Sequence, residues 1–142
     1  RKLIIVNGHG GNSIKNMIRD LSVDFPDFLI AITNWYGIVP QEGYFENKDD
    51  HAGEMETSVM MYYHPELVNL EEAGEGTSKP FALSSLNAQI AWLPRYWSKV
   101  SADTGIGDPR KSTPEKGERY AKAVIEKLAL LFTEIGSKEV YL

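Results

Sequence analysis

Short runs of apolar residues and a stripe of helical spacing alternate along the first part of the chain. Residues 3–6 and 28–32 are continuous apolar runs, which are typical of parallel strands covered on both faces. Asn12 or Ser13 is a candidate N-cap for a helix between them. The pattern predicts a strand–helix–strand unit with a right-handed parallel connection, and hence an α/β fold. The helix would face a sheet with one apolar stripe: Ile14, Met17, Ile18 and Leu21.

The middle of the chain is less regular. Residues 35–50 combine glycine, proline and aromatic residues without a sustained period, which predicts a long loop of the kind that often forms a binding wall. A helix is expected from near Gly53 to His64, because apolar residues recur at helical spacing and Pro65 discourages continuation. His64 is expected to have a structural role, capping the last carbonyl groups of this helix.

The last part of the chain combines a surface loop, an ambiguous stretch and a long helix. Residues 71–80 are polar, and residues 90–93 are expected to form a short strand at an edge or turn, since a proline follows. Residues 112–115 offer both a capping-box spacing and a proline for the first turn of a helix. That helix is expected to end at Gly136 and to bury one face: Ala121, Val124, Ile125, Leu128, Leu131, Phe132 and Ile135.

Composition narrows the class of protein. The 142 residues are 42% hydrophobic and 25% charged, which predicts one soluble globular domain over residues 1–142. A net charge of −5 lacks the basic character that nucleic-acid binding needs, and no apolar run approaches the roughly 20 residues of a membrane span. We therefore expect neither a nucleic-acid nor a membrane partner. The absence of cysteine excludes disulfides, thiolate metal sites and a cysteine nucleophile, and it fits a reducing, cytoplasmic location.

Two glycine-rich turns contain two of the three histidines. His9 lies in the first, Asn-Gly-His-Gly-Gly-Asn at residues 7–12, directly after the first predicted strand. Its glycines leave the ring uncovered, and a histidine so placed suits a divalent metal that activates water. Two alternatives are a histidine that stabilises the turn by hydrogen bonding and an anion-binding glycine nest. A dinucleotide-binding loop is disfavoured, because Ser13 stands where the third glycine would fall.

The second turn, His-Ala-Gly-Glu-Met-Glu-Thr-Ser at residues 51–58, opens a predicted helix. The helix dipole favours acidic residues in a first turn, which explains Glu54 and Glu56 without a functional site. It does not explain His51 or the Ala-Gly pair that follows it. Glu54 and Glu56 point about 160° apart on a helical wheel, so at most one of them can easily reach a metal held by His9.

Together, these two segments resemble the creatininase (creatinine amidohydrolase) family. Its members carry an N-G-H-G-G-N strand end and an H-A-G-x-x-E-T-S turn in the same order. Residues 107–119 also resemble the family's C-terminal signature. The resemblance implies a three-layer α/β/α fold with a mostly parallel sheet. It also implies a metal-dependent amidohydrolase that uses metal-activated water to hydrolyse a C–N bond of a cyclic amide or formamide.

The resemblance also implies roles for individual residues. It makes His9 a metal ligand and His51 the catalytic base, acid or substrate-binding group. Enzymes that act on creatinine carry Tyr-Glu where this chain has Gly10 and Gly11, and that glutamate is a ligand. Creatinine is therefore not the implied substrate. Glu54 is the expected replacement ligand, and Glu56 is expected to orient His51 or to stabilise its charge.

The implied cofactor is a divalent metal: zinc first, with manganese or iron as alternatives, in a dinuclear site of the full-length protein. The implied partners are a small-molecule amide substrate and further copies of the chain, often as a hexamer. The family's N-terminal region supplies an E-x-H-G-x-H-L-P segment and an aspartate that nothing in these 142 residues matches. We therefore expect the C-terminal portion of a longer protein. The rival interpretation is a non-catalytic ligand-binding or assembly module with an incomplete metal site.

Overall fold

The computed structural model describes residues 1–48 and 50–141. Contacts divide the chain into two compact units. Unit 1 comprises Arg1–Pro40 and Lys122–Leu142, and unit 2 comprises Gln41–Ala121. The expectation of a single domain over residues 1–142 stays a prediction.

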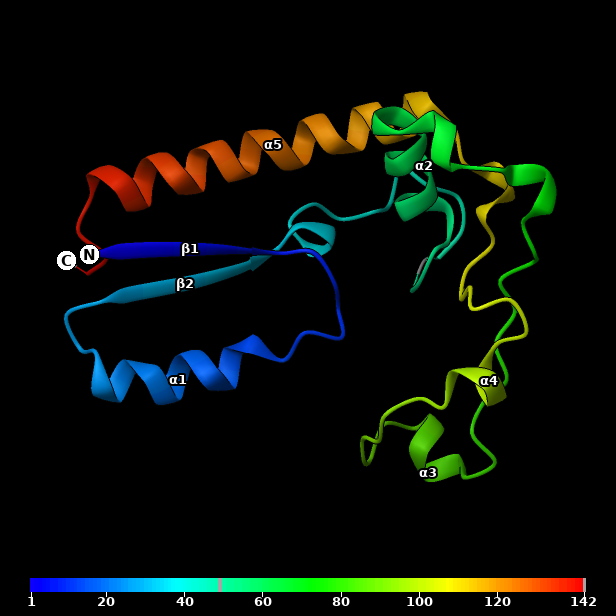
Figure 1. Ribbon diagram of the computed structural model, residues 1–142, viewed down its shortest axis with the longest axis horizontal. Helices are drawn as coiled ribbons and strands as arrows, with labels where there is room; N and C mark the ends of the chain where they lie inside the picture. Colours follow the sequence, from blue (N-terminus) through cyan, green and yellow to red (C-terminus); the bar gives the residue numbers. More distant parts are fainter. Residues whose placement is uncertain (49, 142) are drawn as a thin grey trace. The chain divides into compact units, whose positions relative to one another are not determined.

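Unit 1 contains the predicted strand–helix–strand arrangement. Strands β1 (Lys2–Asn7) and β2 (Leu29–Asn34) pair in parallel, and helix α1 (Ile14–Asp24) connects them (Figure 1). The register places Asn7, the last residue of β1, opposite Asn34, the last residue of β2. The predicted α/β fold class is confirmed, and the two strand ends lie together where the first histidine turn begins.

Helices cover the two faces of this sheet. Figure 1 shows β1 and β2 between α1 and the C-terminal part of α5 (Pro114–Ser137), so that unit 1 has three layers. The Nζ atom of Lys2 donates hydrogen bonds to the carbonyl oxygens of Ile135, at 2.6 Å, and Lys138, at 2.9 Å. These bonds tie the start of β1 to the end of α5.

Strand β1 is less covered than its apolar run predicts. Leu3 and Val6 remain 43% and 44% exposed. Within the described residues the sheet has two strands, so β1 has β2 as its neighbour on one edge. Two strands and two helices therefore do not supply the full cover that a central parallel strand requires.

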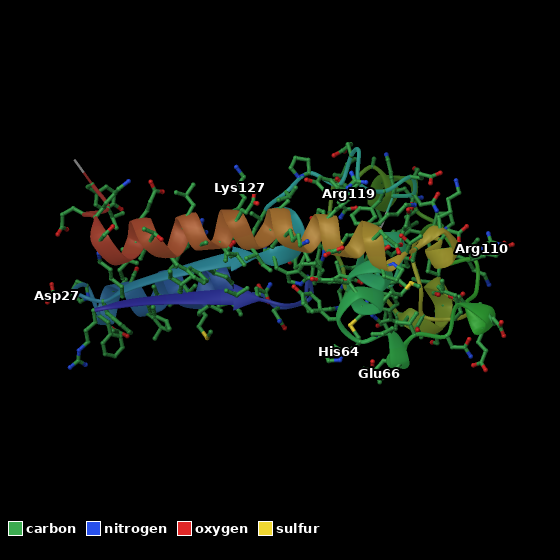
Figure 2. All side chains as sticks on the ribbon, turned by 90° about the horizontal axis from the view of Figure 1, so that it is seen from above. Asp27, His64, Glu66, Arg110, Arg119 and Lys127 are labelled. Atoms are coloured by element: carbon green, nitrogen blue, oxygen red, sulfur yellow. The ribbon has the colours of Figure 1, made fainter. Side chains whose placement is uncertain are left out.

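Unit 2 contains helix α2 (Glu54–Tyr63), which begins after the N-cap residue Gly53 and ends at His64, as predicted. The backbone N–H of His64 donates to the carbonyl of Met60 at 2.7 Å. Its ring Nδ1 instead lies 3.3 Å from Glu66 Oε1, and Figure 2 labels this pair. The backbone of His64, rather than its ring, therefore closes the helix.

The predicted strand at residues 90–93 is wrong. Two short helices, α3 (Ser84–Asn87) and α4 (Trp97–Val100), flank irregular chain in this region. Ile90 and Trp92 are 78% and 85% exposed, so the apolar run pairs with no sheet. Short 3-10 turns complete the regular structure: Trp35–Gly37, Pro65–Leu67, Leu70–Glu72 and Pro109–Lys111.

Helix α5 starts at Pro114, and its cap comes from Thr113. The Oγ1 of Thr113 accepts a hydrogen bond from the backbone N–H of Lys116 at 3.2 Å, the usual geometry of an N-cap side chain. Ala121 and Val124 are buried on the predicted apolar face, whereas other members of that face, such as Ile125 and Phe132, are about half exposed. None of the helices in the described residues has the length and apolar character that a membrane span requires.

Candidate functional site

The first histidine turn is built on the side chain of Asn7, which is buried. Its Nδ2 donates to the carbonyl of His9 and to Oδ1 of Asn34, both at 2.9 Å. Its Oδ1 accepts from the N–H of His9 at 3.3 Å and from Nδ2 of Asn12 at 2.8 Å. A single amide therefore joins the ends of both strands to the turn, and it does so without any charge.

The ring of His9 folds back onto its own turn. Its Nδ1 accepts a hydrogen bond from the N–H of Gly11 at 3.0 Å. A neutral imidazole that accepts at Nδ1 carries its proton on Nε2, so either nitrogen could ligate a metal only after this bond is broken. A Cβ added at Gly11 would lie 3.0 Å from the same Nδ1, which shows why glycine suits this position. The histidine is thus of the right type for a ligand, but in this structure it stabilises the turn.

Two aromatic residues of the predicted binding-wall loop lie beside this turn. The indole Nε1 of Trp35 donates to the carbonyl of Gly8 at 3.3 Å. The hydroxyl of Tyr36 lies 3.7 Å from the position that a Cβ would take at Gly10. This part of the loop therefore contacts the glycines around His9.

The rest of the same loop helps to form the core of unit 2. The rings of Tyr44 and Phe45 pack edge-on against Tyr120, with centroid separations of 5.4 and 5.1 Å. Tyr120 is fully buried, and the guanidinium of Arg119 lies 5.4 Å from the ring of Tyr44. Tyr44 and Phe45 are therefore packing residues, which the sequence pattern did not distinguish from binding residues.

The second histidine turn is fixed mainly through its backbone. The N–H of His51 donates to the carbonyl of Ile106 at 2.9 Å, and the N–H of Ile106 donates back at 2.8 Å. Ala52 has a φ of 51°, the left-handed region that side chains disfavour. Its N–H donates to Oε2 of Glu56 at 2.6 Å, and its carbonyl accepts from Oγ1 of Thr57 at 3.3 Å. Glu56 therefore holds a strained residue next to His51.

Glu54 is fully buried, and both of its carboxylate oxygens are occupied. Oε2 accepts from the N–H groups of Glu46 at 3.0 Å and Asn47 at 2.7 Å, and Oε1 accepts from Nζ of Lys116 at 2.6 Å. The hydrogen bond that Lys116 donates to Glu54 is the largest influence on this ammonium group and raises its pKa. Glu54 and Lys116 form an ion pair in which the carboxylate is fully buried and the lysine side chain is 20% exposed, and the same carboxylate holds the loop at residues 46–47.

These contacts do not fit the predicted role of Glu54 as a metal ligand. A ligating carboxylate must turn a lone pair toward the ion, whereas this one faces three donors inside unit 2. Across residues 1–48 and 50–141, no three His, Asp or Glu side chains gather as a set that could hold a metal ion. His9 belongs to unit 1 and Glu54 to unit 2, so the pairing of the two on one metal stays a prediction, and the contacts of Glu54 argue against it.

The end of the second motif packs α2 against the start of α5. Ser58 is fully buried, and its Oγ accepts from the N–H of Thr113 at 3.2 Å. The Oγ of Ser112 donates to the carbonyl of Glu54 at 3.1 Å. A Cβ added at Gly117 would lie 1.9 Å from the carbonyl oxygen of Ser58, so only glycine allows this approach.

Sequence reasoning missed this support beneath the second turn. Its one available signal was that Glu54 and Ser58 share a helical face, which a helix packed on that face would bury. The residue types of the partners, Lys116 and Gly117, became meaningful only when the structure placed them against α2.

Comparisons with known proteins agree with the two motifs. A family model described as "Creatininase: Creatinine amidohydrolase" matches residues 1–132. The crystal structure of a Bacteroides fragilis protein, provisionally described as a creatinine amidohydrolase, is 61% identical, with a TM-score of 0.95 over 100% of this chain and 56% of its own. A mutant creatininase described as the Zn-Zn type has 22% identity and a TM-score of 0.68, over 91% of this chain and 54% of its own.

One curated relative has a different description. The mycofactocin precursor peptide peptidase of Mycobacterium ulcerans is 30% identical over 88% of this chain and 45% of its own length. The chain thus spans about half the length of the relatives that it matches.

Proposed function

The chain belongs to the creatininase family, and we propose that it forms part of a metal-dependent amidohydrolase. The observation that carries the proposal is the pair of histidine turns, each held by a hydrogen-bond network of its own. A bound divalent metal would supply an activated water and polarise the carbonyl of the substrate. Zinc is the first candidate, because a solved relative is described as the Zn-Zn type, and manganese and iron are the alternatives.

The proposed roles follow the two turns. His9 is the proposed metal ligand, and the remaining ligands would come from outside these 142 residues. His51 is proposed to pass a proton to the leaving nitrogen. Glu56 is proposed to orient His51 by holding the N–H of Ala52. Glu54 moves from the ligand role to structural support, because its contacts leave it facing Lys116.

Two substrate classes compete. The first is a cyclic amide or formamide, in keeping with the family's description as creatinine amidohydrolase. The second is a peptide bond, which is favoured by the similarity to a precursor peptide peptidase. We further propose a cytoplasmic homo-oligomer, with a hexamer as the first candidate. The rival from another class remains a ligand-binding or assembly module that performs no chemistry.

The test compares the 142-residue chain with the full natural reading frame. Both are assayed against a formamide, a cyclic amide and a short peptide, and bound metal is measured by elemental analysis. We expect His9→Ala to lose metal and activity together, and His51→Ala to lose activity while keeping metal. His64→Ala is the matched control, because His64 pairs with Glu66 at a helix end. Loss of metal in proportion to activity in His51→Ala would exchange the two roles, and metal binding without hydrolysis of any substrate would support the non-catalytic module.

A further inference from the structure

The ring of His51 packs against an aromatic side chain from a distant part of unit 2. The imidazole of His51 and the indole of Trp97 have a centroid separation of 4.8 Å and an interplanar angle of 50°. Trp97 is 37% exposed and opens the short helix α4 (Trp97–Val100). No sequence signal connects the two rings, which are 46 residues apart in the chain.

A second contact holds the same segment to the residue before His51. Arg95 forms a two-pronged ion pair with Asp50, in which its NH1 and NH2 nitrogens face the two carboxylate oxygens. The guanidinium carbon of Arg95 also lies 5.7 Å from the centroid of the Trp97 ring. Planar guanidinium groups favour both contacts, the paired bonds to a carboxylate and the position over an indole. Arg95 therefore links Asp50, Trp97 and, through them, His51.

We propose that Trp97 is a positioning residue for His51, and that the Arg95–Asp50 ion pair keeps Trp97 in place. This inference rests on the proposed role of His51 in proton transfer. The backbone of His51 is fixed by Ile106, and Trp97 packs directly against its ring. The outer torsion of histidine is broad and roughly two-fold, and a neighbouring ring narrows it. An imidazole packed against a neighbouring ring in this way keeps its two nitrogens in a more constant direction.

Positioning of the His51 ring matters because proton transfer depends on the distance between the donor and acceptor atoms. Proton transfer requires the donor and acceptor atoms to lie within hydrogen-bond reach, at about 2.6–3.2 Å. A ring that rotates away spends part of its time out of reach, and a displacement of about 1 Å can reduce a rate by about a hundred-fold. Trp97 therefore acts on turnover through His51, without touching the reacting atoms.

The first test needs no substrate. The 142-residue sequence contains three histidines, so ring-labelled histidine gives few signals from this part of the protein in nuclear magnetic resonance. The His51 signal is assigned by its absence in His51→Ala. We expect the ring current of Trp97 to displace this signal, Trp97→Leu to remove the displacement, and Trp97→Phe to keep part of it. Trp92→Leu is the matched control, because Trp92 lies in the irregular segment between α3 and α4, close to Trp97 in the sequence, and is 85% exposed. An unchanged His51 signal in Trp97→Leu would overturn the proposal.

The second test measures enzyme kinetics with the full-length, metal-loaded protein, in the wild-type and His51→Ala backgrounds. The substrate is the formamide, cyclic amide or peptide that the wild type hydrolyses fastest. We expect Trp97→Leu to lower kcat about ten- to a hundred-fold with little change in KM, and Trp97→Phe to restore much of the rate. In the His51→Ala background, Trp97→Leu is expected to have no further effect. An equal loss in both backgrounds, or a loss confined to KM, would mean that Trp97 binds substrate directly and would overturn the positioning role. If His51→Ala retained full activity, the proposed function of His51 would fail while the ring contact could still be seen by resonance.

The ion pair has its own matched control. Lys99 lies 5.6 Å from the ring of Tyr96, so it is a second cation over a ring on the same segment, but that ring is not the one against His51. We expect Arg95→Met to broaden or shift the His51 signal and to lower kcat less than Trp97→Leu does. Lys99→Met should leave both unchanged. Equal effects of the two substitutions would indicate a general loss of charge and would count against the link from Arg95 to His51.

Discussion

In both histidine turns a glycine lies within two residues of the histidine and a helix follows, but different interactions hold the two turns. The turn at residues 7–12 depends on neutral amides centred on Asn7, and residues 8–12 are exposed. The turn at residues 51–58 depends on backbone bonds to Ile106 and on carboxylates, and Glu54 and Ser58 are fully buried beneath it.

The two turns therefore differ in how easily their hydrogen bonds can rearrange. A neutral hydrogen bond contributes only about 0.5–1.5 kcal/mol net, and water can replace one at an exposed turn. Removing one partner of a buried ion pair costs about 3–5 kcal/mol, because the other charge is left without compensation. The first turn is therefore free to give up the bond from Gly11 to His9 for a ligand, whereas the second is a fixed support.

The largest expected effect comes from breaking the ion pair under the second turn. Glu54→Ala leaves the N–H groups of Glu46 and Asn47 without their acceptor, and Lys116 keeps only Glu46 Oε1 and the carbonyl of Lys111 as acceptors. We expect a loss of about 3–5 kcal/mol in the free energy of unfolding, measured by urea denaturation. Glu126→Ala, an exposed carboxylate on α5, is the control and should change stability by less than about 0.5 kcal/mol.

The same variant decides whether Glu54 is a ligand. Partial recovery of stability in the double variant Glu54→Ala/Lys116→Met is expected, because the ammonium group that has lost its nearest carboxylate is then removed as well. Bound metal per folded molecule should stay unchanged. Loss of metal at nearly normal stability would restore Glu54 to the metal site and would make the comparison of the two turns wrong.

The next effect tests the close approach of α2 and α5. Gly117→Ala would place its Cβ 1.9 Å from the carbonyl oxygen of Ser58, so the helices must separate. We expect a loss of about 1–3 kcal/mol or more, as for other overpacked contacts. Gly136→Ala on the same helix meets nothing within 4 Å and should stabilise by about 0.5 kcal/mol. Equal thermal shifts in the two variants would show that helix propensity, and not packing, governs position 117.

Much of the fold could be predicted because its signals are local. The apolar runs at residues 3–6 and 28–32 and the helical stripe between them specify a strand–helix–strand unit by spacing alone. The run at residues 90–93 has a similar composition but no sheet to pair with, so Ile90 and Trp92 are exposed instead. A sequence window cannot reveal whether a partner strand exists, which is why that prediction failed.

The candidate site could be predicted only in part for the same reason. The glycine residues near His9 and His51 predicted the positions of both turns, since a turn is determined by neighbouring residues. The partner of Glu54 is Lys116, 62 positions away, and the partner of the His51 ring is Trp97. Long-range pairs of this kind decide whether a carboxylate faces a metal or an ammonium group, and they follow from packing rather than from spacing.

A smaller effect is expected from the amide network of the first turn. Asn7→Ala removes bonds to His9, Asn12 and Asn34, and we expect a loss of about 1–2 kcal/mol together with weaker metal binding by the full-length protein. Asn16→Ala, on the exposed side of α1, is the control. The free energy of unfolding is measured by urea denaturation. An equal loss in Asn7→Ala and Asn16→Ala would contradict the role of the Asn7 amide in joining the strand ends to the turn.

The smallest expected effect is acid-dependent and belongs to the second unit. The side chain of Arg110 lowers the pKa of Asp108 from its ordinary value of 3.8 to about 2, with help from the N–H of the same arginine. The carbonyl of Asp108 also accepts from Nδ2 of Asn47, one of the residues that Glu54 holds. A carboxyl group whose pKa falls on folding stabilises the protein above its unfolded value and loses this contribution as the pH falls through its folded value. The stability difference between the wild type and Asp108→Asn should therefore be complete above about pH 4 and absent below about pH 2, as measured by urea denaturation across this range. A stability difference that did not change with pH would mean that Asp108 acts through its shape and not through its charge. The role of charge in the second unit would then have to be given up at this position.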